Sequence, residues 1–210
     1  MASEGRRLAP VQLDWRAQHD STYGVGSYVA TFPGVSVNGG SVEETACGGG
    51  SEYCKVGYWG NNVVAVNCYA SSGAPADSMF TLNFTDQSPI GTPSYQYAWA
   101  DQPSSASYTP YYFYQKGYIA RECGSDGGQV TIQRTSPGYY RANLPVLGPL
   151  NSNVKVSAYG GSSETCKVVG WSSNGSGGTS VTIACFNAAG VPVDSYFDFV
   201  YACHLLNRTH

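Results

Sequence analysis

Ser51-Glu52-Tyr53-Cys54-Lys55-Val56 and Ser163-Glu164-Thr165-Cys166-Lys167-Val168 are two versions of one hexapeptide, 112 positions apart. Trp59 follows the first hexapeptide and Trp171 follows the second at the same spacing. Rare residue types that recur together in this way indicate an internal duplication. The fold that the sequence predicts is therefore built from this repeat.

The duplication extends well beyond the hexapeptides. Five extra residues in the second copy, around Asn174, change the offset to 117. After them, Gly73-x-Pro75-x-Asp77-Ser78-x-Phe80 aligns with Gly190-x-Pro192-x-Asp194-Ser195-x-Phe197. The match covers residues 24 to 86 and 136 to 203, which indicates two copies of one structural unit.

Each copy has the pattern of short antiparallel strands. Polar and apolar side chains alternate over residues 154–159, and residues 166–171 and 180–186 flank a turn rich in Gly, Ser and Asn. Such alternation between turn residues is typical of β-strands and hairpins. The hairpin brings Cys166 beside Cys185, and we expect a disulfide between them.

The same reasoning pairs Cys54 with Cys68 in the first copy. Each disulfide closes a short loop, for which the loss of chain entropy in the unfolded state is about 3 kcal/mol. The insertion around Asn174 falls at a hairpin tip, where extra residues are tolerated.

The sequence predicts an all-β protein of two tandem β-sandwich-like modules of antiparallel strands, stapled by disulfides. The expected division is an N-terminal segment (1–23), a short first module (24–90) and a second module (91–210) with additional leading strands. Because residues 1–23 do not match those leading strands at the repeat offset, we expect an open sheet edge in the first module.

Composition excludes several functions. Only 12% of the 210 residues are charged, the net charge is −3, and the Lys and Arg residues are scattered, so we expect no nucleic-acid partner. No run approaches the roughly 20 apolar residues of a membrane-spanning helix. We expect no membrane span and no cofactor.

The cysteines indicate secretion. Seven cysteines without metal-ligand spacing are typical of an oxidising compartment, although the first residues lack the apolar stretch of a signal peptide. The two predicted disulfides leave three cysteines unpaired: Cys47, Cys123 and Cys203. For these we expect an intersubunit disulfide or a buried thiol. Candidate glycosylation triplets begin at Asn83, Asn174 and Asn207.

The sequence predicts no catalytic or metal site. The three histidines form no ligand motif, and serine is not part of a nucleophile elbow. Asp77 and Asp194 recur at one repeat position; glycoside hydrolysis by paired carboxylates is the alternative, but a Pro-x-Asp-Ser turn favours capping of backbone N–H groups. Trp59 and Trp171 are expected to pack on a disulfide or on the core.

An aromatic cluster outside the repeat is the candidate binding surface. Its members are too close together to be all internal in an alternating strand, so some must face solvent. The candidates are Tyr108, Tyr111, Tyr112, Tyr114, Tyr118 and Trp99. We predict a non-catalytic extracellular structural or adhesive protein that self-associates, with carbohydrate binding through this cluster as the alternative.

The repeated motifs resemble an uncharacterised tandem-repeat family of secreted bacterial proteins. They are Cys-Lys-Val followed by Trp, then Cys-Tyr or Cys-Phe, then Gly-x-Pro-x-Asp-Ser-x-Phe, together with Phe32-Pro33-Gly34 and residues 99–103. The resemblance implies an extracellular β-rich module without an assigned activity. Two departures are Leu144-Pro145-Val146 in place of Phe-Pro-Gly, and Cys47 where the second copy has Tyr159.

Overall fold

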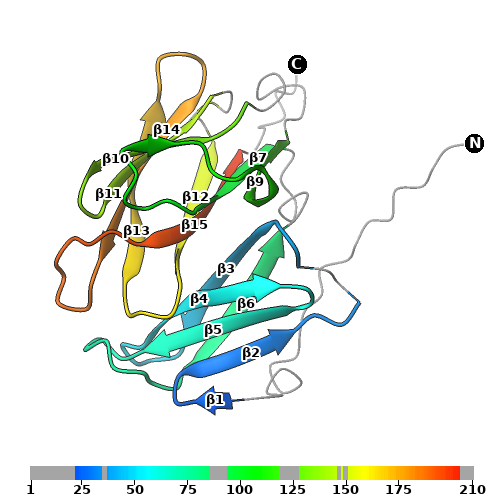
Figure 1. Cartoon of the computed structure of the whole chain (residues 1–210), viewed down its shortest axis with the longest axis vertical. Coiled ribbons are helices and arrows are strands. Elements are labelled where there is room, and N and C mark those ends of the chain that lie inside the picture. Colours follow the sequence, from blue (N-terminus) through cyan, green and yellow to red (C-terminus); the bar gives the residue numbers. More distant parts are fainter. Residues whose placement is uncertain are drawn as a thin grey trace, which may run out of the picture.

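The computed structural model describes residues 22–34, 37–85, 94–118, 128–145, 148 and 151–203, and this part of the chain is all-β as predicted (Figure 1). The strands are β1 (Thr22–Gly24), β2 (Ser27–Thr31), β3 (Ser41–Cys47), β4 (Tyr53–Gly60), β5 (Val63–Tyr69), β6 (Met79–Thr85), β7 (Ser94–Ala100), β8 (Ser107–Tyr108), β9 (Gln115–Tyr118), β10 (Thr131–Ser136), β11 (Tyr139–Leu144), β12 (Ser152–Tyr159), β13 (Thr165–Ser173), β14 (Thr179–Phe186) and β15 (Tyr196–Cys203). A 3-10 turn, η2 (Tyr112–Tyr114), lies between β8 and β9.

The first module is a small sandwich. Strands β1, β2, β5 and β4 form one layer in that order, and β3 and β6 pair antiparallel as a second. Alternate residues of β2 and β5 are buried and, with Cys54, Val56 and Trp59 of β4, join residues of β3 and β6 in one apolar cluster. The alternation read from the sequence therefore corresponds to an inner and an outer face.

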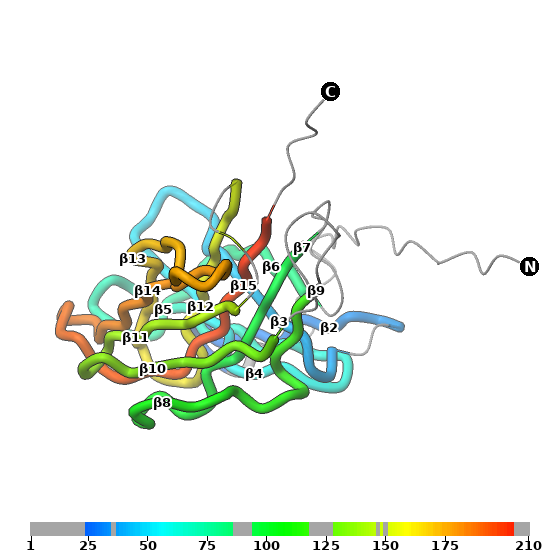
Figure 2. The backbone as a smooth tube through the Cα atoms, turned by 90° about the horizontal axis from the view of Figure 1, so that it is seen from above, coloured from blue at the N-terminus to red at the C-terminus, as the bar shows by residue number. Residues whose placement is uncertain are grey.

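The second module repeats this plan and extends it. Strands β11 to β15 correspond to β2 to β6, and Figure 2 shows its first layer in the order β8, β10, β11, β14 and β13. In the second layer, β7 pairs along the outer edge of β15, and β9 pairs with β7. These are the leading strands that the first module was expected to lack; among the described residues, the strand neighbour of β6 is β3.

The two modules share one sheet. β4 of the first module pairs with β12 of the second, with Val56 opposite Tyr159, which makes a continuous eight-stranded sheet. This pairing is parallel, whereas the strand pairs within each module are antiparallel. The expected antiparallel pattern thus describes the modules but not their junction.

Both predicted hairpin disulfides are present. Cys54 and Cys68 lie directly opposite each other on β4 and β5, as do Cys166 and Cys185 on β13 and β14. Of the additional cysteines, Cys47 is exposed at the end of β3. Cys203 is buried at the end of β15, and Cys123 lies outside the described residues. The intersubunit disulfide stays a prediction.

Asp77 and Asp194 have a structural role at equivalent positions. Asp77 accepts hydrogen bonds from the backbone N–H of Gly26 (2.8 Å) and the hydroxyl of Tyr28 (2.9 Å). Asp194 accepts the same two bonds from Gly138 and Tyr140. Each carboxylate accepts a hydrogen bond from a backbone N–H, as expected. This N–H belongs to the β1–β2 turn or the β10–β11 turn, and not to the turn that contains the Asp. Hydrogen bonding to Gly26 lowers the pKa of Asp77, and bonding to Arg134 lowers that of Asp194.

The repeated tryptophans differ, although the same packing was expected for both. Trp59 is 5% exposed, and its indole N–H donates to the carbonyl of Gly39. Trp171 is 40% exposed, and its indole N–H donates to the hydroxyl of Ser152. Aromatic rings of the second module pack over Trp59. Among the described residues, no further module packs over Trp171.

Candidate functional site: the aromatic turn and the module junction

Three adjacent rings project from the turn that connects β8 and β9. Tyr111, Tyr112 and Phe113 are 49%, 60% and 58% exposed. Their ring centroids lie 4.3 to 5.6 Å apart, so the three rings form one contiguous surface. We call these three residues the aromatic turn. The crowding of aromatic residues in the sequence correctly indicated that some of them face solvent.

Buried hydrogen bonds hold the aromatic turn in place. Gln115, the first residue of β9, is buried; its side-chain amide donates to the carbonyl of Pro110 and accepts from the backbone N–H of Val130 at 2.9 Å. The backbone N–H of Tyr114 also donates to the carbonyl of Tyr111. The rings are therefore presented by a constrained segment, which lowers the entropy cost of binding through them.

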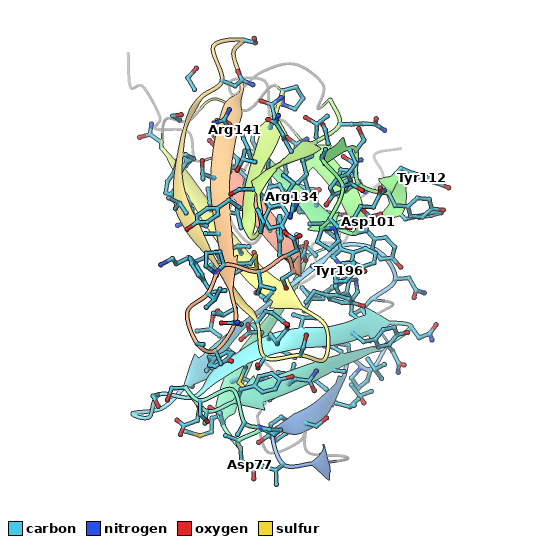
Figure 3. The ribbon with its side chains drawn as sticks, turned by 60° about the vertical axis from the view of Figure 1, so that its left-hand side comes forward. Asp77, Asp101, Tyr112, Arg134, Arg141 and Tyr196 are labelled. Carbon is cyan, nitrogen blue, oxygen red and sulfur yellow. A yellow bond between two sulfur atoms is a disulfide. The ribbon has the colours of Figure 1, made fainter. Side chains whose placement is uncertain are left out.

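A stripe of rings leads from the aromatic turn towards the junction of the modules. Tyr114, half-buried, lies 5.1 Å from the ring of Trp99, and Trp99 stacks against Tyr196 at 6.3 Å. Tyr196 is 44% exposed. Figure 3 shows Tyr112, Asp101 and Tyr196 on the same side of the molecule. The predicted residues Tyr114 and Trp99 thus join the exposed turn to the core.

Two polar atoms beside this stripe are buried without a hydrogen-bond partner: the indole nitrogen of Trp99 and one carboxylate oxygen of Asp101. Unpaired buried polar groups are rare in native structures, so these two atoms need an explanation. Tyr108 is half-buried, and burial raises the pKa of its hydroxyl above the usual range. Tyr118 pairs with Tyr95, and its side chain lies outside the described part of the chain.

A second group of polar contacts lies where the two modules meet. The turn after β12 presents its backbone carbonyls to the first module: Lys55 donates to that of Ser162 at 2.9 Å, and Tyr69 to that of Gly161 at 2.7 Å. Lys55 is also 3.4 Å from the carboxylate of Glu164. Burial lowers the pKa of Lys55, and the charge of Glu164 opposes this shift.

Carboxyl groups are buried in the same junction. Asp198, fully buried in β15, accepts from the hydroxyl of Ser41 at 2.6 Å. Glu43 is 6% exposed and 3.7 Å from Lys155. Burial raises the pKa of Asp198 well above its usual range and that of Glu43 to about 7, although Lys155 opposes the second shift. A lone Asp in the apolar run from Phe197 to Val200 was the sequence signal for this buried partner.

The candidate glycosylation residues have different surroundings. Asn174 is half-buried, and its amide nitrogen donates to the side chain of Asn143 at 2.9 Å, a bond that a glycan on this nitrogen would have to replace. Asn83 lies in β6, and its side-chain amide donates a hydrogen bond to the hydroxyl of Thr85 at 3.4 Å. Asn207 lies outside the described residues.

Within the described ranges, no three His, Cys, Asp or Glu side chains gather as metal ligands. The same part of the chain contains no helix with the length and apolar character needed to cross a membrane. Comparisons of the chain with protein-family models, with curated proteins and with solved structures find no match.

Proposed function

We propose that this chain is a secreted adhesive protein of β repeats, which acts by binding a partner through the aromatic turn rather than by catalysis. The main support for this proposal is the exposure of three adjacent rings on a constrained segment. About half or more of the surface is exposed in each of Tyr111, Tyr112 and Phe113. Contiguous exposed aromatic surface is typical of binding sites, because large rigid rings lose little entropy on contact.

Secretion is part of this proposal. Two disulfides in one chain support an oxidising compartment, because thiols are kept reduced in the cytosol. The resemblance of the repeated motifs to secreted bacterial proteins supports the same compartment.

A second candidate function is carbohydrate binding, and one observation favours it. The indole nitrogen of Trp99 and a carboxylate oxygen of Asp101 are buried and unpaired beside the stripe of rings. Sugar recognition combines an aromatic face, on which the ring stacks, with polar groups that bond to hydroxyls. Neither atom is exposed to solvent, so a sugar hydroxyl would accept from the indole N–H or donate to the carboxylate only after the side chains that cover these atoms move.

The test compares the unaltered chain with Tyr112→Ser/Phe113→Ser in binding to cellulose, to chitin and to a protein-coated surface. The matched control is Val25→Ser/Val191→Ser, because these two side chains are equally exposed but lie away from the turn. We expect the turn variant to lose about tenfold in affinity, a typical cost of removing an aromatic anchor, and the control to bind normally. Equal binding by all three would contradict the proposal.

Asp101→Ala separates the two candidates. If sugar is the partner, this change weakens polysaccharide binding without affecting the protein-coated surface. Binding to the protein-coated surface that requires Tyr112 and Phe113 but not Asp101 would favour the adhesive role without a sugar.

A further inference from the structure

The contact between the two modules provides a template for a contact between two copies of the chain. Within the chain, Lys55 and Trp59 of the first module form the receiving surface. The second module docks on them with Glu164, 3.4 Å from Lys55, and with Tyr159, whose ring lies 5.2 Å from that of Trp59. The backbone N–H of Gly160 completes the contact by donating to the carbonyl of Val56.

The second module carries the same receiving surface, and there it is uncovered. Lys167 stands at the repeat position of Lys55, and Trp171 at that of Trp59. Lys167 is exposed, Val169 between them is 58% exposed, and Trp171 is 40% exposed, against 5% for Trp59. β13, which holds these residues, has β14 as its one strand neighbour among the described strands, whereas β4 is paired on both sides.

The first module carries the matching docking surface, also uncovered. Gly48-Gly49-Gly50-Ser51-Glu52 stands at the repeat position of the docking turn 160–164, and all five residues are exposed. Cys47 takes the place of Tyr159 and is exposed, and Met79 takes the place of Tyr196 and is 61% exposed. Apolar and acidic groups on this surface thus complement the apolar and basic groups around Trp171.

We propose that copies of this protein associate head to tail, with residues 47–52 of one copy docking on β13 and β14 of another, and with Glu52 paired to Lys167 of that other copy. The partner is a second copy because the repeat counterparts of these two surfaces, the turn 160–164 and β4, are bonded to each other within the chain. A head-to-tail contact leaves one free surface at each end, so further copies can add.

One module can carry both surfaces because residues 47–52 remain exposed, although the next residue, Tyr53, donates its hydroxyl to the carbonyl of Ser163 in the contact within the chain. The contact within the chain uses Ser41 and Glu43 near the start of β3. The proposed contact uses Cys47 at its end and the turn that follows. Asp198 has no acidic counterpart, since Thr81 stands at its repeat position. We therefore expect the contact between copies to be weaker than the contact within the chain.

Sedimentation velocity on the full chain up to millimolar concentration tests the proposal, with Lys167→Glu and Glu52→Lys as variants. Each variant alone places like charges opposite each other, and we expect its association constant to fall about tenfold. In an equimolar mixture of the two variants, the turn of each variant is complementary only to the receiving surface of the other, so we expect the apparent association constant to return to about half that of the unaltered chain. Lys116→Glu, an exposed residue on β9, is the control for net charge and should associate normally.

Three outcomes would overturn the proposal: an unaltered chain that stays monomeric, variants that associate like the unaltered chain, or a mixture that fails to recover. Circular dichroism establishes that each variant is folded. Because Lys167 and Glu52 are not part of the aromatic turn, head-to-tail association can fail while binding through Tyr112 and Phe113 persists. The two proposals are therefore tested separately.

Discussion

The backbone N–H of Val42 donates to a carboxylate oxygen of Asp198 at 2.8 Å, which joins the start of β3 in the first module to β15 in the second. The hydroxyl of Ser41 donates to the same oxygen. Because Asp198 is fully buried and lies 156 positions from Val42, this bond fixes the two modules relative to each other.

Replacing Asp198 with Ala should lower the free energy of unfolding by about 2 to 3 kcal/mol, because it leaves the N–H of Val42 and the hydroxyl of Ser41 buried without a partner. Urea denaturation followed by circular dichroism measures the change. Ser41→Ala removes one of the two bonds and should cost about 1 kcal/mol. A loss no larger for Asp198→Ala than for Ser41→Ala would contradict this account.

Stability should decrease as the pH rises through neutrality, because burial raises the pKa of Glu43 to about 7. A carboxyl group whose pKa is higher in the folded state favours folding fully below its unfolded pKa, near 4.5, and this contribution is lost as the pH rises through 7. The free energy of unfolding of the unaltered chain should therefore fall between pH 5 and pH 8, with a contribution from Glu43 on the order of 2 to 3 kcal/mol.

Glu43→Gln should flatten this pH dependence, measured by urea denaturation at a series of pH values. Part of the dependence will remain, because burial also raises the pKa of Glu44 and that of Asp198. Glu52→Gln removes the same charge from an exposed position and serves as the control, at concentrations where the chain is monomeric. An identical pH profile for Glu43→Gln and the unaltered chain would argue against a raised pKa for the buried Glu43.

Trp59→Ala should cost about 3 to 5 kcal/mol of stability, as expected for a large buried ring. Trp171→Ala, at the same repeat position, should cost less than about 1 kcal/mol in the monomer, because Trp171 is 40% exposed. Thermal and urea unfolding of the two variants side by side measure the difference. Equal losses would mean that the two tryptophans are equally packed, contrary to the structure.

Removing either hairpin disulfide should lower stability by about 3 kcal/mol, since Cys54–Cys68 and Cys166–Cys185 close loops of similar length, with sequence separations of 14 and 19. The double variants Cys54→Ser/Cys68→Ser and Cys166→Ser/Cys185→Ser, unfolded in urea without reductant, provide the measurement. A variant as stable as the unaltered chain would show that the corresponding bond adds nothing.

The sequence predicts those parts of the fold that depend on neighbouring strands. Cys54 meets Cys68, and Cys166 meets Cys185, because each pair lies on two strands joined by a short turn, and the repeat shows this arrangement twice. Alternation of polar and apolar residues likewise predicts strands with one buried face, such as β2 and β5, whereas β7 and β15 are buried along nearly their whole length.

The junction could not be predicted in this way. Asp198 and Val42 lie in different modules, and their contact depends on how two finished sandwiches dock, which local patterns do not encode. The same docking explains why Trp59 is buried and Trp171 is not, although the motif around them is the same. For the candidate site, crowding indicated exposed aromatic residues, but not that Gln115 would hold them on a 3-10 turn.

The two cross-strand disulfides also determine how the chain responds to mechanical tension. A load applied between the chain ends bypasses the residues enclosed by Cys54 and Cys68 and those enclosed by Cys166 and Cys185, because the covalent bonds carry it across the base of each hairpin. Each module would therefore keep one unextended loop when its remaining strands are pulled apart. The maximum extension of the chain would then be longer under reducing conditions than under oxidising ones.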